Sequence, residues 1–266
     1  MKKFLTMSLL LILVCSLFGC AQKQENKDLL AEIKDRGYVT IATEGAWSPW
    51  TYHDPETEEL VGFDVELGKL IAKGLGVEAR FEEVVWDSIL SGVSAQSKRF
   101  DLGINGVDWT AERAEAYNFS DPYVYTSSVL IVPEANTDIK SFEDLAGHTT
   151  TNSIGSVYQT MAESYGATVI TGDTFADTIN LITRGDADAT INALETYSDY
   201  IKEKPDAPIK VVAQSAGNPI CIIAAKDNST VSLISEINKI LADLRASGEL
   251  SALSVKYFGL DITEQK

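Results

Sequence analysis

The sequence contains few cysteines, few histidines and no pattern of metal ligands, which excludes several kinds of site. Its only cysteines are Cys15, Cys20 and Cys221. The first lies in an apolar N-terminal run and the second directly after it, so no disulfide is expected in the mature chain. Cys221 is expected to be a small buried apolar side chain. His53 and His148 have no partners at ligand spacing, so neither a metal nor a cofactor is expected.

Basic residues are also scarce. The chain has 22 Lys and Arg against 39 Asp and Glu, which gives a formal net charge of −17. Such a balance argues against nucleic acid as a partner and against electrostatic docking on a membrane. The 266 residues are 45% hydrophobic, which is ordinary globular composition. That length allows one large domain or two lobes, and a monomer is expected.

The N-terminus has the pattern of an export signal. Two lysines precede the apolar run Leu5–Phe18, which is too short to span a bilayer comfortably. The run ends in Leu17-Phe-Gly-Cys20, which resembles the bacterial lipobox and predicts a lipoprotein signal peptide over 1–19. Acylated Cys20 and the segment 20–36 would then form a lipid anchor and tether that hold the protein outside the cytoplasm, on the bacterial cell membrane. A plain signal peptide is the alternative.

The rest of the chain alternates between strand and helix patterns in two blocks. In the first block we expect strands at 38–43, 79–85 and 99–104, and helices at 64–75, capped by Asp64, and at 86–98. In the second we expect strands at 149–152, 168–171, 187–191 and 209–212, and helices at 141–146, 157–165, 175–183 and 194–204. Extended runs at 123–133 and 218–225 connect the blocks, and helices at 231–244 and 250–258 close the chain.

This alternation predicts an α/β protein with two lobes of mainly parallel strands and two extended crossings between them. The first lobe is expected at 37–132 plus 222–266 and the second at 133–221. In open parallel sheets, ligands bind beyond the carboxyl ends of the strands. A cleft between the facing lobes is therefore the expected site.

Arg113 is the first candidate for that cleft. The strand before it is expected to stop at the turn-forming pair Asn105-Gly106, and Thr110 is a candidate N-cap for the short helix that follows. An arginine in the first turn of a helix suits an anion held by the free N–H groups there. The alternative is an ordinary surface ion pair with Glu112 or Glu115.

Aromatic and acidic residues supply the other candidates. Trp47 and Trp86 follow expected strands and are predicted to face the cleft, where an aromatic face suits a flat or cationic group. Trp109 is a further candidate, whereas Trp50 is assigned to packing. Glu44 is expected either to meet a distal cation of the ligand or to cap a solvated loop.

Several motifs together resemble the polar amino-acid solute-binding proteins of ABC importers. They are Gly62-Phe-Asp64, Trp86-Asp87, the turn from Gly106 to Arg113, and Phe119-Ser-Asp-Pro-Tyr123. Gly185-Asp-Ala-Asp-Ala-Thr190 and the segment 200–212 are most similar to the cystine-binding branch. The match spans essentially the whole mature domain, and implies a bilobal, periplasmic-binding-protein-like fold of type II.

The resemblance also implies roles for single residues. Arg113 would clamp the α-carboxylate of an amino acid, helped by the backbone N–H of Asp108 and by Ser156 of the second lobe. The carbonyl of Gly106 would receive the α-ammonium, and Trp47 and Trp86 would enclose the ligand side chain.

Two positions depart from the family pattern. Asp108 stands where Ser or Thr is usual, and Ala193 stands where the family places the aspartate that pairs with the ammonium. One hypothesis is that the carboxylate has moved to Asp108, with Asn192 or Glu195 as weaker candidates. The other is that the ligand has no ordinary α-ammonium, or a methylated one.

The expected function is a receptor that binds L-cystine, or another polar or cationic amino acid, between closing lobes and delivers it to an ABC transporter permease. An enzyme similar to cyclohexadienyl dehydratase is the alternative, since one fold supports several chemistries. That enzyme needs an acid in the cleft, for which Asp108 or Glu195 would have to serve. No enzymatic activity is expected.

Overall fold

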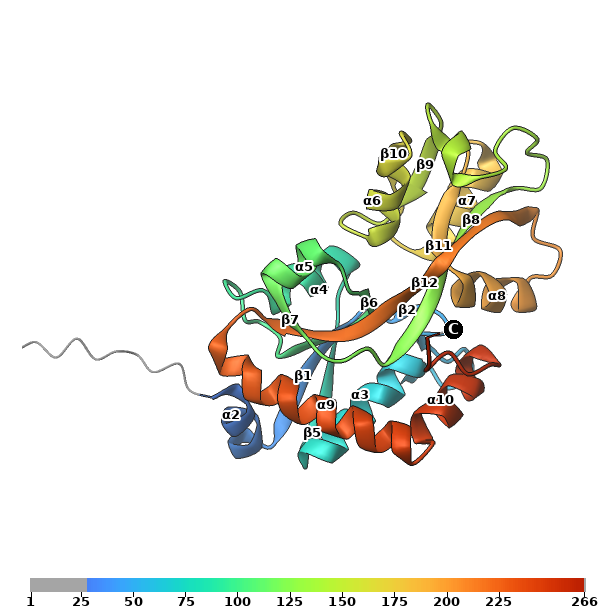
Figure 1. Ribbon diagram of the computed structural model, residues 1–266. Helices are drawn as coiled ribbons and strands as arrows, with labels where there is room; N and C mark the ends of the chain where they lie inside the picture. The colour runs from blue at the N-terminus through green and yellow to red at the C-terminus, as the bar shows by residue number, and fades with distance from the viewer. Residues whose placement is uncertain (1–27, 266) are drawn as a thin grey trace, which may run out of the picture.

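The computed structural model describes residues 28–265, which form two α/β lobes joined by two long strands (Figure 1). Both ends of the described chain belong to the first lobe, and the middle of the chain forms the second. Within this described part, no helix is both long enough and apolar enough to cross a membrane. The signal peptide expected over 1–19 and the acylated Cys20 lie outside the described residues.

The first lobe is built on three parallel strands with β1 in the centre, between β5 and β6. Its strands are β1 (Tyr38–Thr43), β2 (Ala46–Trp47), β3 (Thr51–His53), β4 (Leu60–Val61), β5 (Glu78–Glu83), β6 (Leu102–Asp108) and β7 (Tyr117–Phe119). Its helices are α2 (Leu29–Arg36), α3 (Phe63–Leu75), α4 (Trp86–Val93), α5 (Ala111–Ala116), the 3-10 turn η2 (Asn228–Thr230), α9 (Val231–Ala246) and α10 (Glu249–Phe258).

The core of this lobe lies on both faces of β1. Val39 and Ile41 pack with apolar residues of α3 and α9, whereas Ala42 packs with residues of α4. Helix α2 lies within the segment 20–36 that was expected to be anchor and tether, and its Ile33 is fully buried in the core. We therefore propose that the first lobe begins at Leu29.

The second lobe is smaller and follows the predicted strand and helix order. It contains η1 (Phe142–Leu145), β9 (Thr149–Asn152), α6 (Val157–Ser164), β10 (Thr168–Thr171), α7 (Phe175–Arg184), β11 (Thr190–Ala193) and α8 (Leu194–Glu203). Strands β9 and β10 are parallel, and β11 runs antiparallel to the crossing strand β8. Helices α6, α7 and α8 each begin near the end of a strand, which places their N-termini on the side that faces the first lobe.

The two crossings are β8 (Val124–Pro133) and β12 (Ile209–Ala225), which pair with each other along most of their length. At one end β12 pairs with β6, and at the other β8 pairs with β11, so one sheet runs through both lobes. The prediction of two extended crossings is confirmed. The strand 209–212 and the run 218–225, expected to be separate, are one strand with two shifts of register.

Three local predictions are wrong. β6 does not stop at Asn105-Gly106 but continues to Asp108, because pairing with β12 holds this stretch in the sheet and Gly106 adopts a φ of 57°. Asp64 does not cap α3; Gly62 is the N-cap, and Asp64 is buried in the first turn. The helix expected over 86–98 ends at Val93.

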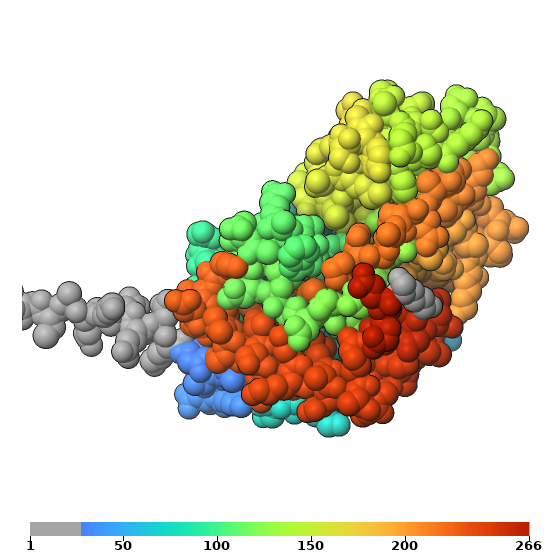
Figure 2. Space-filling model, in the orientation of Figure 1, coloured from blue at the N-terminus to red at the C-terminus, as the bar shows by residue number. Residues whose placement is uncertain are grey.

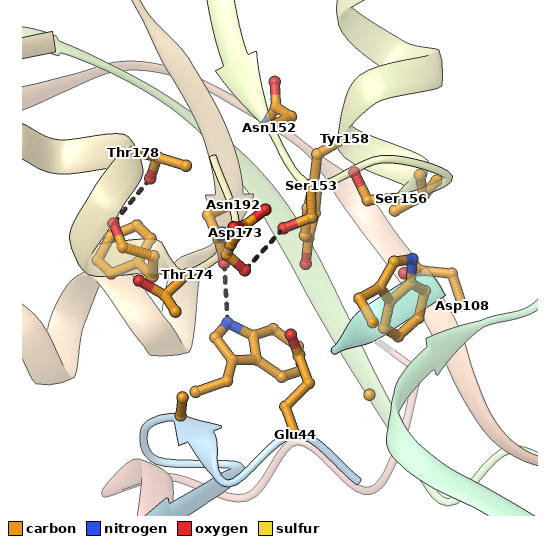
Figure 3. A pocket seen from close by; sticks show the side chains of 16 residues that line it. Glu44, Asp108, Asn152, Ser153, Ser156, Tyr158, Asp173, Thr174, Thr178 and Asn192 are labelled. Atoms are coloured by element: carbon orange, nitrogen blue, oxygen red, sulfur yellow. Dashed lines mark hydrogen bonds between the residues drawn. The ribbon is translucent and has the colours of Figure 1, made fainter. Parts of the chain in front are cut away.

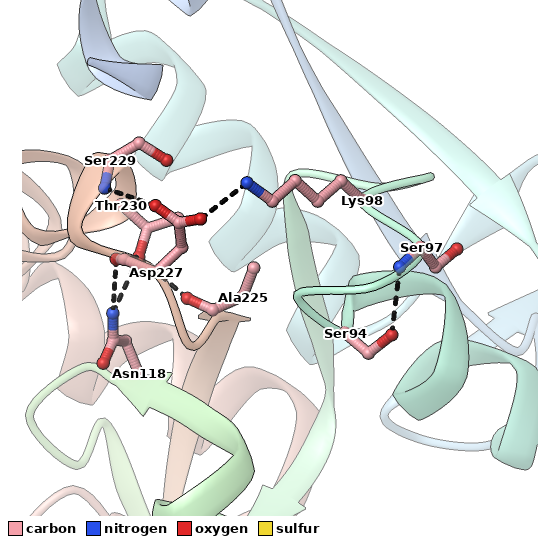
Figure 4. Close-up of polar contacts among 8 residues, drawn as sticks. All are labelled: Ser94, Ser97, Lys98, Asn118, Ala225, Asp227, Ser229 and Thr230. Carbon is pink, nitrogen blue, oxygen red and sulfur yellow. Dashed lines mark hydrogen bonds and ion pairs between the residues drawn. The ribbon is translucent and has the colours of Figure 1, made fainter. Parts of the chain in front are cut away.

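Asp227 joins three segments of the first lobe (Figure 4). Its carboxylate accepts from the backbone N–H of Ser229 at 2.8 Å and pairs with Lys98 at 2.6 Å. Its backbone carbonyl accepts from Asn118 of β7 at 3.0 Å. The bonds from Lys98 and from the Ser229 backbone lower the pKa of Asp227 to about 2.

Asp227→Ala is expected to lower the free energy of unfolding by about 1–2 kcal/mol, because it removes an N-cap and an ion pair. A carboxyl whose pKa is lowered in the folded state stabilises above its unfolded pKa near 3.8, and this contribution disappears as the pH falls through 2. Urea unfolding at pH 7 and at pH 3 measures both effects. The exposed Asp206 supplies the control, since Asp206→Ala should change stability by less than about 0.5 kcal/mol. Equal stability of the two variants would contradict this role for Asp227.

Candidate ligand site between the lobes

A pocket with about 550 Å³ of empty space lies between the two lobes, and both contribute to its wall (Figure 3). It is lined by Glu44, Ala46, Trp47, Trp86, Gly106, Asp108, Asn152, Ser153, Ser156, Val157, Tyr158, Asp173, Thr174, Phe175, Thr178 and Asn192. The first-lobe residues follow β1 or lie at the ends of β6 and α4, and the second-lobe residues lie at or just after the ends of β9, β10 and β11. This is the edge at which ligands bind in open α/β sheets.

Seven of the nine predicted ligand-binding residues line this pocket: Glu44, Trp47, Trp86, Gly106, Asp108, Ser156 and Asn192. The other two do not. Trp109 is 46% exposed on the surface. Arg113 lines an adjoining cavity between α4, α5 and the start of α6, which shares Val157 with the pocket.

Gly106 lines the pocket, and the buried Asp64 lies behind it. The backbone N–H of Gly106 donates to the buried Asp64 carboxylate at 2.6 Å, and the Tyr123 hydroxyl donates to the other carboxylate oxygen at 2.9 Å. Burial raises the pKa of Asp64 to about 7, although these two hydrogen bonds act to lower it. A Cβ on residue 106 would lie 2.4 Å from the ring of Trp47, so only glycine lets the indole lie against β6.

Glu44 is a partly buried acid in the pocket wall. Its carboxylate accepts from Asn105 Nδ2 at 2.8 Å, and its backbone N–H donates to Asn105 Oδ1 at 2.9 Å. Burial raises the pKa of Glu44 to about 7, and the bond from Asn105 opposes part of that rise. Because its carboxylate is bonded to Asn105 in the pocket wall, Glu44 does not cap a solvated loop. It can pair with a cation inside the pocket.

Asp108 lies at the other end of the pocket, with Arg113 beside it in the adjoining cavity. Arg113 Nη1 donates to the backbone carbonyl of Asp108 at 3.0 Å, and Thr110 Oγ1 accepts from the backbone N–H of Arg113, as the predicted N-cap. Burial raises the pKa of Asp108 to about 6, although the Arg113 charge and a bond from Asn218 lower it. The expected surface pairs of Arg113 with Glu112 or Glu115 do not occur among the described residues.

Aromatic rings enclose the space between these two ends. Trp47 stacks on Trp50 with ring centroids 5.2 Å apart, and Trp50 is completely buried, as its assignment to packing predicted. Trp86 lies under the Arg113 guanidinium, 5.3 Å from its centre. The buried indole Nε1 of Trp86 has no hydrogen-bond partner among residues 28–265, which leaves a donor free for a ligand.

The second lobe contributes residues that the sequence reasoning missed, mainly Tyr158, Asp173, Thr174 and Phe175. Asp173 and Thr174 follow β10, so the rule that ligands bind beyond the carboxyl ends of strands applies to them as well. Tyr158 lies in the first turn of α6, behind the predicted Ser156, which caps that helix through a bond from Gln159 N. No simple signal in the sequence distinguishes Tyr158 from a core aromatic residue.

Three hydrogen bonds join the lobes in and around the pocket. Trp47 Nε1 donates to Asn192 Oδ1 at 3.2 Å, and Ser48 Oγ donates to Asp199 at 2.6 Å. Arg113 Nη2 donates to the carbonyl of Gly155 at 3.1 Å. Figure 2 shows the result on one face, where the first lobe around α5 meets the second lobe around α6. The structure is therefore a closed arrangement of the lobes.

The two weaker candidates for pairing with an ammonium, Asn192 and Glu195, are poorly placed. Asn192 Oδ1 already accepts from Trp47 and from the backbone N–H of Ala193. Glu195 is buried beside the crossing strand β8, where Thr126 donates to its carboxylate, and it does not line the pocket. Within the described residues, no group of three His, Cys, Asp or Glu side chains is placed to hold a metal.

Comparison with known proteins identifies close relatives over almost the whole chain. Residues 39–260 match the family model for bacterial extracellular solute-binding proteins, family 3. The L-cystine-binding protein TcyA of Bacillus subtilis is 33% identical over 99% of this chain and 100% of its own length. A probable amino-acid ABC transporter-binding protein of Haemophilus influenzae is 36% identical over 88% of this chain and 91% of its own.

Solved structures agree with this match. A mutant of the arginine-binding protein of T. maritima superposes with a TM-score of 0.79 at 30% identity, covering 86% of this chain and 99% of that one. The predicted bilobal fold of the periplasmic-binding-protein type is thus confirmed by relatives with closely similar structures.

Proposed function

The chain belongs to the family 3 bacterial extracellular solute-binding proteins, and we propose that it captures an amino acid between its lobes and delivers it to the permease of an ABC transporter. The observation that carries this proposal is the pocket itself, which takes its lining from both lobes and is bridged by three hydrogen bonds between them. A ligand held by both lobes stabilises the closed form, which is how binding is coupled to hinge motion.

We propose that the ligand carries a second cationic group besides its α-ammonium, with L-cystine first and arginine or lysine as the other choices. Glu44, Asp108 and Asp173 line the pocket, and no lysine, arginine or histidine among residues 28–265 does. Trp47, Trp86, Tyr158 and Phe175 add aromatic surface, on which a cation gains about 0.5–2 kcal/mol per favourable ring. The cystine-binding and arginine-binding relatives support the same class of ligand.

Seven of the nine predicted residues receive a role in this proposal. The Arg113 guanidinium binds the α-carboxylate, which takes the place of the Gly155 carbonyl as acceptor, and the Ser156 hydroxyl donates to it from the second lobe. The Gly106 carbonyl and the Asp108 carboxylate receive the α-ammonium. Trp47 and Trp86 enclose the side chain, and Glu44 pairs with its distal cation. Trp109 is left out, because it is exposed and lies outside the pocket wall.

Binding is favoured over the dehydratase alternative by the relatives described above, which are binding proteins rather than enzymes. Of the two acids considered for proton transfer, Glu195 does not line the pocket. Asp108 does line it, and its proposed role is to pair with the α-ammonium.

We further propose that the protein acts outside the cytoplasm as a monomer, attached to the membrane by a lipid on Cys20. The export-signal pattern over 1–19 and the extracellular family support this proposal. Membrane fractionation of cells that express the wild type or Cys20→Ala tests it. The wild type should remain with the membrane, and the variant should be released or stay uncleaved.

A thermal-shift screen of the purified protein tests the ligand class. L-cystine, L-arginine, L-lysine, neutral amino acids and quaternary amines are compared at equal concentration. A ligand at 100 times its Kd stabilises the folded state by about 2.7 kcal/mol, which is a clear rise in Tm. The proposal is wrong if none of these compounds raises the Tm but a prephenate-like acid is turned over.

Ligand affinity is expected to fall as the pH drops from 8 to 5. The ligand-free pKa values of Glu44 and Asp108 are about 7 and about 6, and a bound cation favours the ionised form of both. Binding below these pH values must displace protons, so each group lowers the affinity by up to about tenfold per pH unit. Calorimetric titration at several pH values, in buffers of different ionisation enthalpy, measures both affinity and proton release. Glu44→Gln should remove the part of the slope nearest pH 7, whereas a flat profile in the wild type would contradict the assignment.

A further inference from the structure

Asn105 is a buried amide directly behind the acidic wall of the pocket. It lies in β6, is completely buried and does not itself line the pocket. Its Oδ1 accepts from Thr43 Oγ1 and from the backbone N–H of Glu44, both at 2.9 Å, and Thr51 Oγ1 lies at 3.4 Å. The side chain is therefore held by three neighbouring donors.

These contacts determine which way the amide faces. A backbone N–H only donates, so the atom opposite the N–H of Glu44 must be the amide oxygen. The NH₂ group then faces the other way, where Glu44 Oε2 lies 2.8 Å from Nδ2. The same residue thus contacts Glu44 twice, at its backbone and at its carboxylate.

The bond to the carboxylate is the feature that favours a charged Glu44. Across the pocket, the other titratable side chains in the wall are Asp108 of β6, Tyr158 of α6 and Asp173 before α7. Asp108 and Asp173 are acids and Tyr158 is a phenol, so none of the three stabilises a negative charge on Glu44. Burial also disfavours the ionised form of Glu44 and raises its pKa. The hydrogen bond from the Asn105 amide lowers the pKa of Glu44 and so opposes this rise.

We propose that Asn105 is a positioning residue for specificity: it holds the Glu44 carboxylate in place for the distal cation of the ligand, and so makes the pocket prefer cationic side chains over neutral ones of the same shape. This inference rests on the proposed function, because it assumes that an amino acid occupies the pocket. Asn105 would then influence which ligand is bound without contacting the ligand itself.

Asn105→Asp tests the proposal with little change in shape. The new carboxylate still accepts from Thr43 and from the Glu44 backbone, but it faces Glu44 with an oxygen instead of a donor. The two acids then share a proton, so the titration of Glu44 moves to higher pH. We expect the affinity for L-arginine or L-cystine at pH 7 to fall roughly ten- to a hundredfold. The affinity for L-citrulline, a neutral analogue of arginine, should change by less than about threefold.

Two further variants separate this effect from a damaged fold. Asn136→Asp makes the same substitution at a second-lobe turn, where Asn136 Oδ1 likewise accepts from a backbone N–H and Nδ2 donates to the carbonyl of Ile139. It should leave the preference for arginine over citrulline unchanged. Glu44→Gln/Asn105→Asp exchanges the amide and the carboxylate. It should recover part of the affinity lost in Asn105→Asp, because the donor and the charge are both present again.

The Glu44 titration is followed in the ligand-free protein by carbon NMR of labelled glutamate, assigned with Glu44→Gln. An unchanged Glu44 titration and an unchanged arginine-to-citrulline ratio in Asn105→Asp would overturn the inference, as would a folded double variant with no recovery. If the wild type binds none of the amino acids, the proposed function fails. The NMR titration still decides in that case whether Asn105 controls Glu44.

Discussion

Arg113→Ala is expected to weaken amino-acid binding by roughly thirtyfold to several-thousandfold. Removing one partner of a buried, hydrogen-bonded charge pair costs about 2–5 kcal/mol, and each 1.4 kcal/mol is about a factor of ten. Arg113 meets the conditions for such a loss, because its guanidinium is partly buried and reaches acceptors of both lobes, Asp108 and Gly155. A carboxylate bound there by two parallel N–H bonds stabilises the closed form as well.

The matched variants make this result specific. Arg113→Lys keeps the charge but loses the bidentate hydrogen bonds of the guanidinium to a carboxylate, so it should bind with intermediate affinity. Arg184→Ala removes an exposed arginine of the second lobe that pairs with Asp186, and it should leave the affinity unchanged. Calorimetric titration of the three variants measures the differences, and their Tm values check the fold. If Arg113→Ala binds as tightly as Arg184→Ala, Arg113 is not the carboxylate clamp.

Asp108→Asn is the second large effect that we expect, with a loss in the same range of roughly thirtyfold or more. The substitution keeps the size of the side chain and removes its charge, so the α-ammonium would lose the carboxylate partner proposed for it. Asp108 is 4% exposed and lies at the pocket end of β6, beside Arg113. A buried ammonium without a counter-charge is costly, which is why the effect should be large.

Moving the carboxylate to the second lobe tests this interpretation. Asp108→Asn/Ala193→Asp places the acid at the N-cap of α8, where aspartate is a favourable residue. We expect the double variant to bind more tightly than Asp108→Asn alone. If Asp108→Asn binds with the affinity of the wild type, the ligand has no ordinary α-ammonium at this end. A quaternary amine found in the thermal-shift screen would then be the better ligand.

Much of the fold was predictable because local and tertiary preferences agree. Strands β1, β9 and β10 were predicted with their observed bounds, since each is a short β-rich run between turn residues. β6 was predicted too short, because Asn105-Gly106 is a strong local turn signal and only pairing with β12 and the bond to Asp64 keep it extended. Tertiary contacts of that kind leave no mark in the local sequence.

The site was predictable to the extent that it follows the rule of strand ends. Glu44 and Trp47 follow from this rule, whereas Asp108, Ser156 and Asn192 came from the family resemblance; all five line the pocket. Asp64 was assigned to a helix cap because aspartate favours that position, whereas its buried bonds to Gly106 and Tyr123 depend on the packed fold. The exposure of Trp109 and the facing of Asn105 toward Glu44 likewise follow from packing rather than from spacing.

The most direct test of this account is calorimetric titration of the purified protein with L-cystine, L-arginine and L-lysine at pH 7.5. The account predicts saturable binding of one molecule per chain for at least one of them, absent or strongly weakened in Arg113→Ala. Heats no larger than dilution for all three amino acids, or equally tight binding to wild type and Arg113→Ala, would contradict a ligand clamp between the lobes.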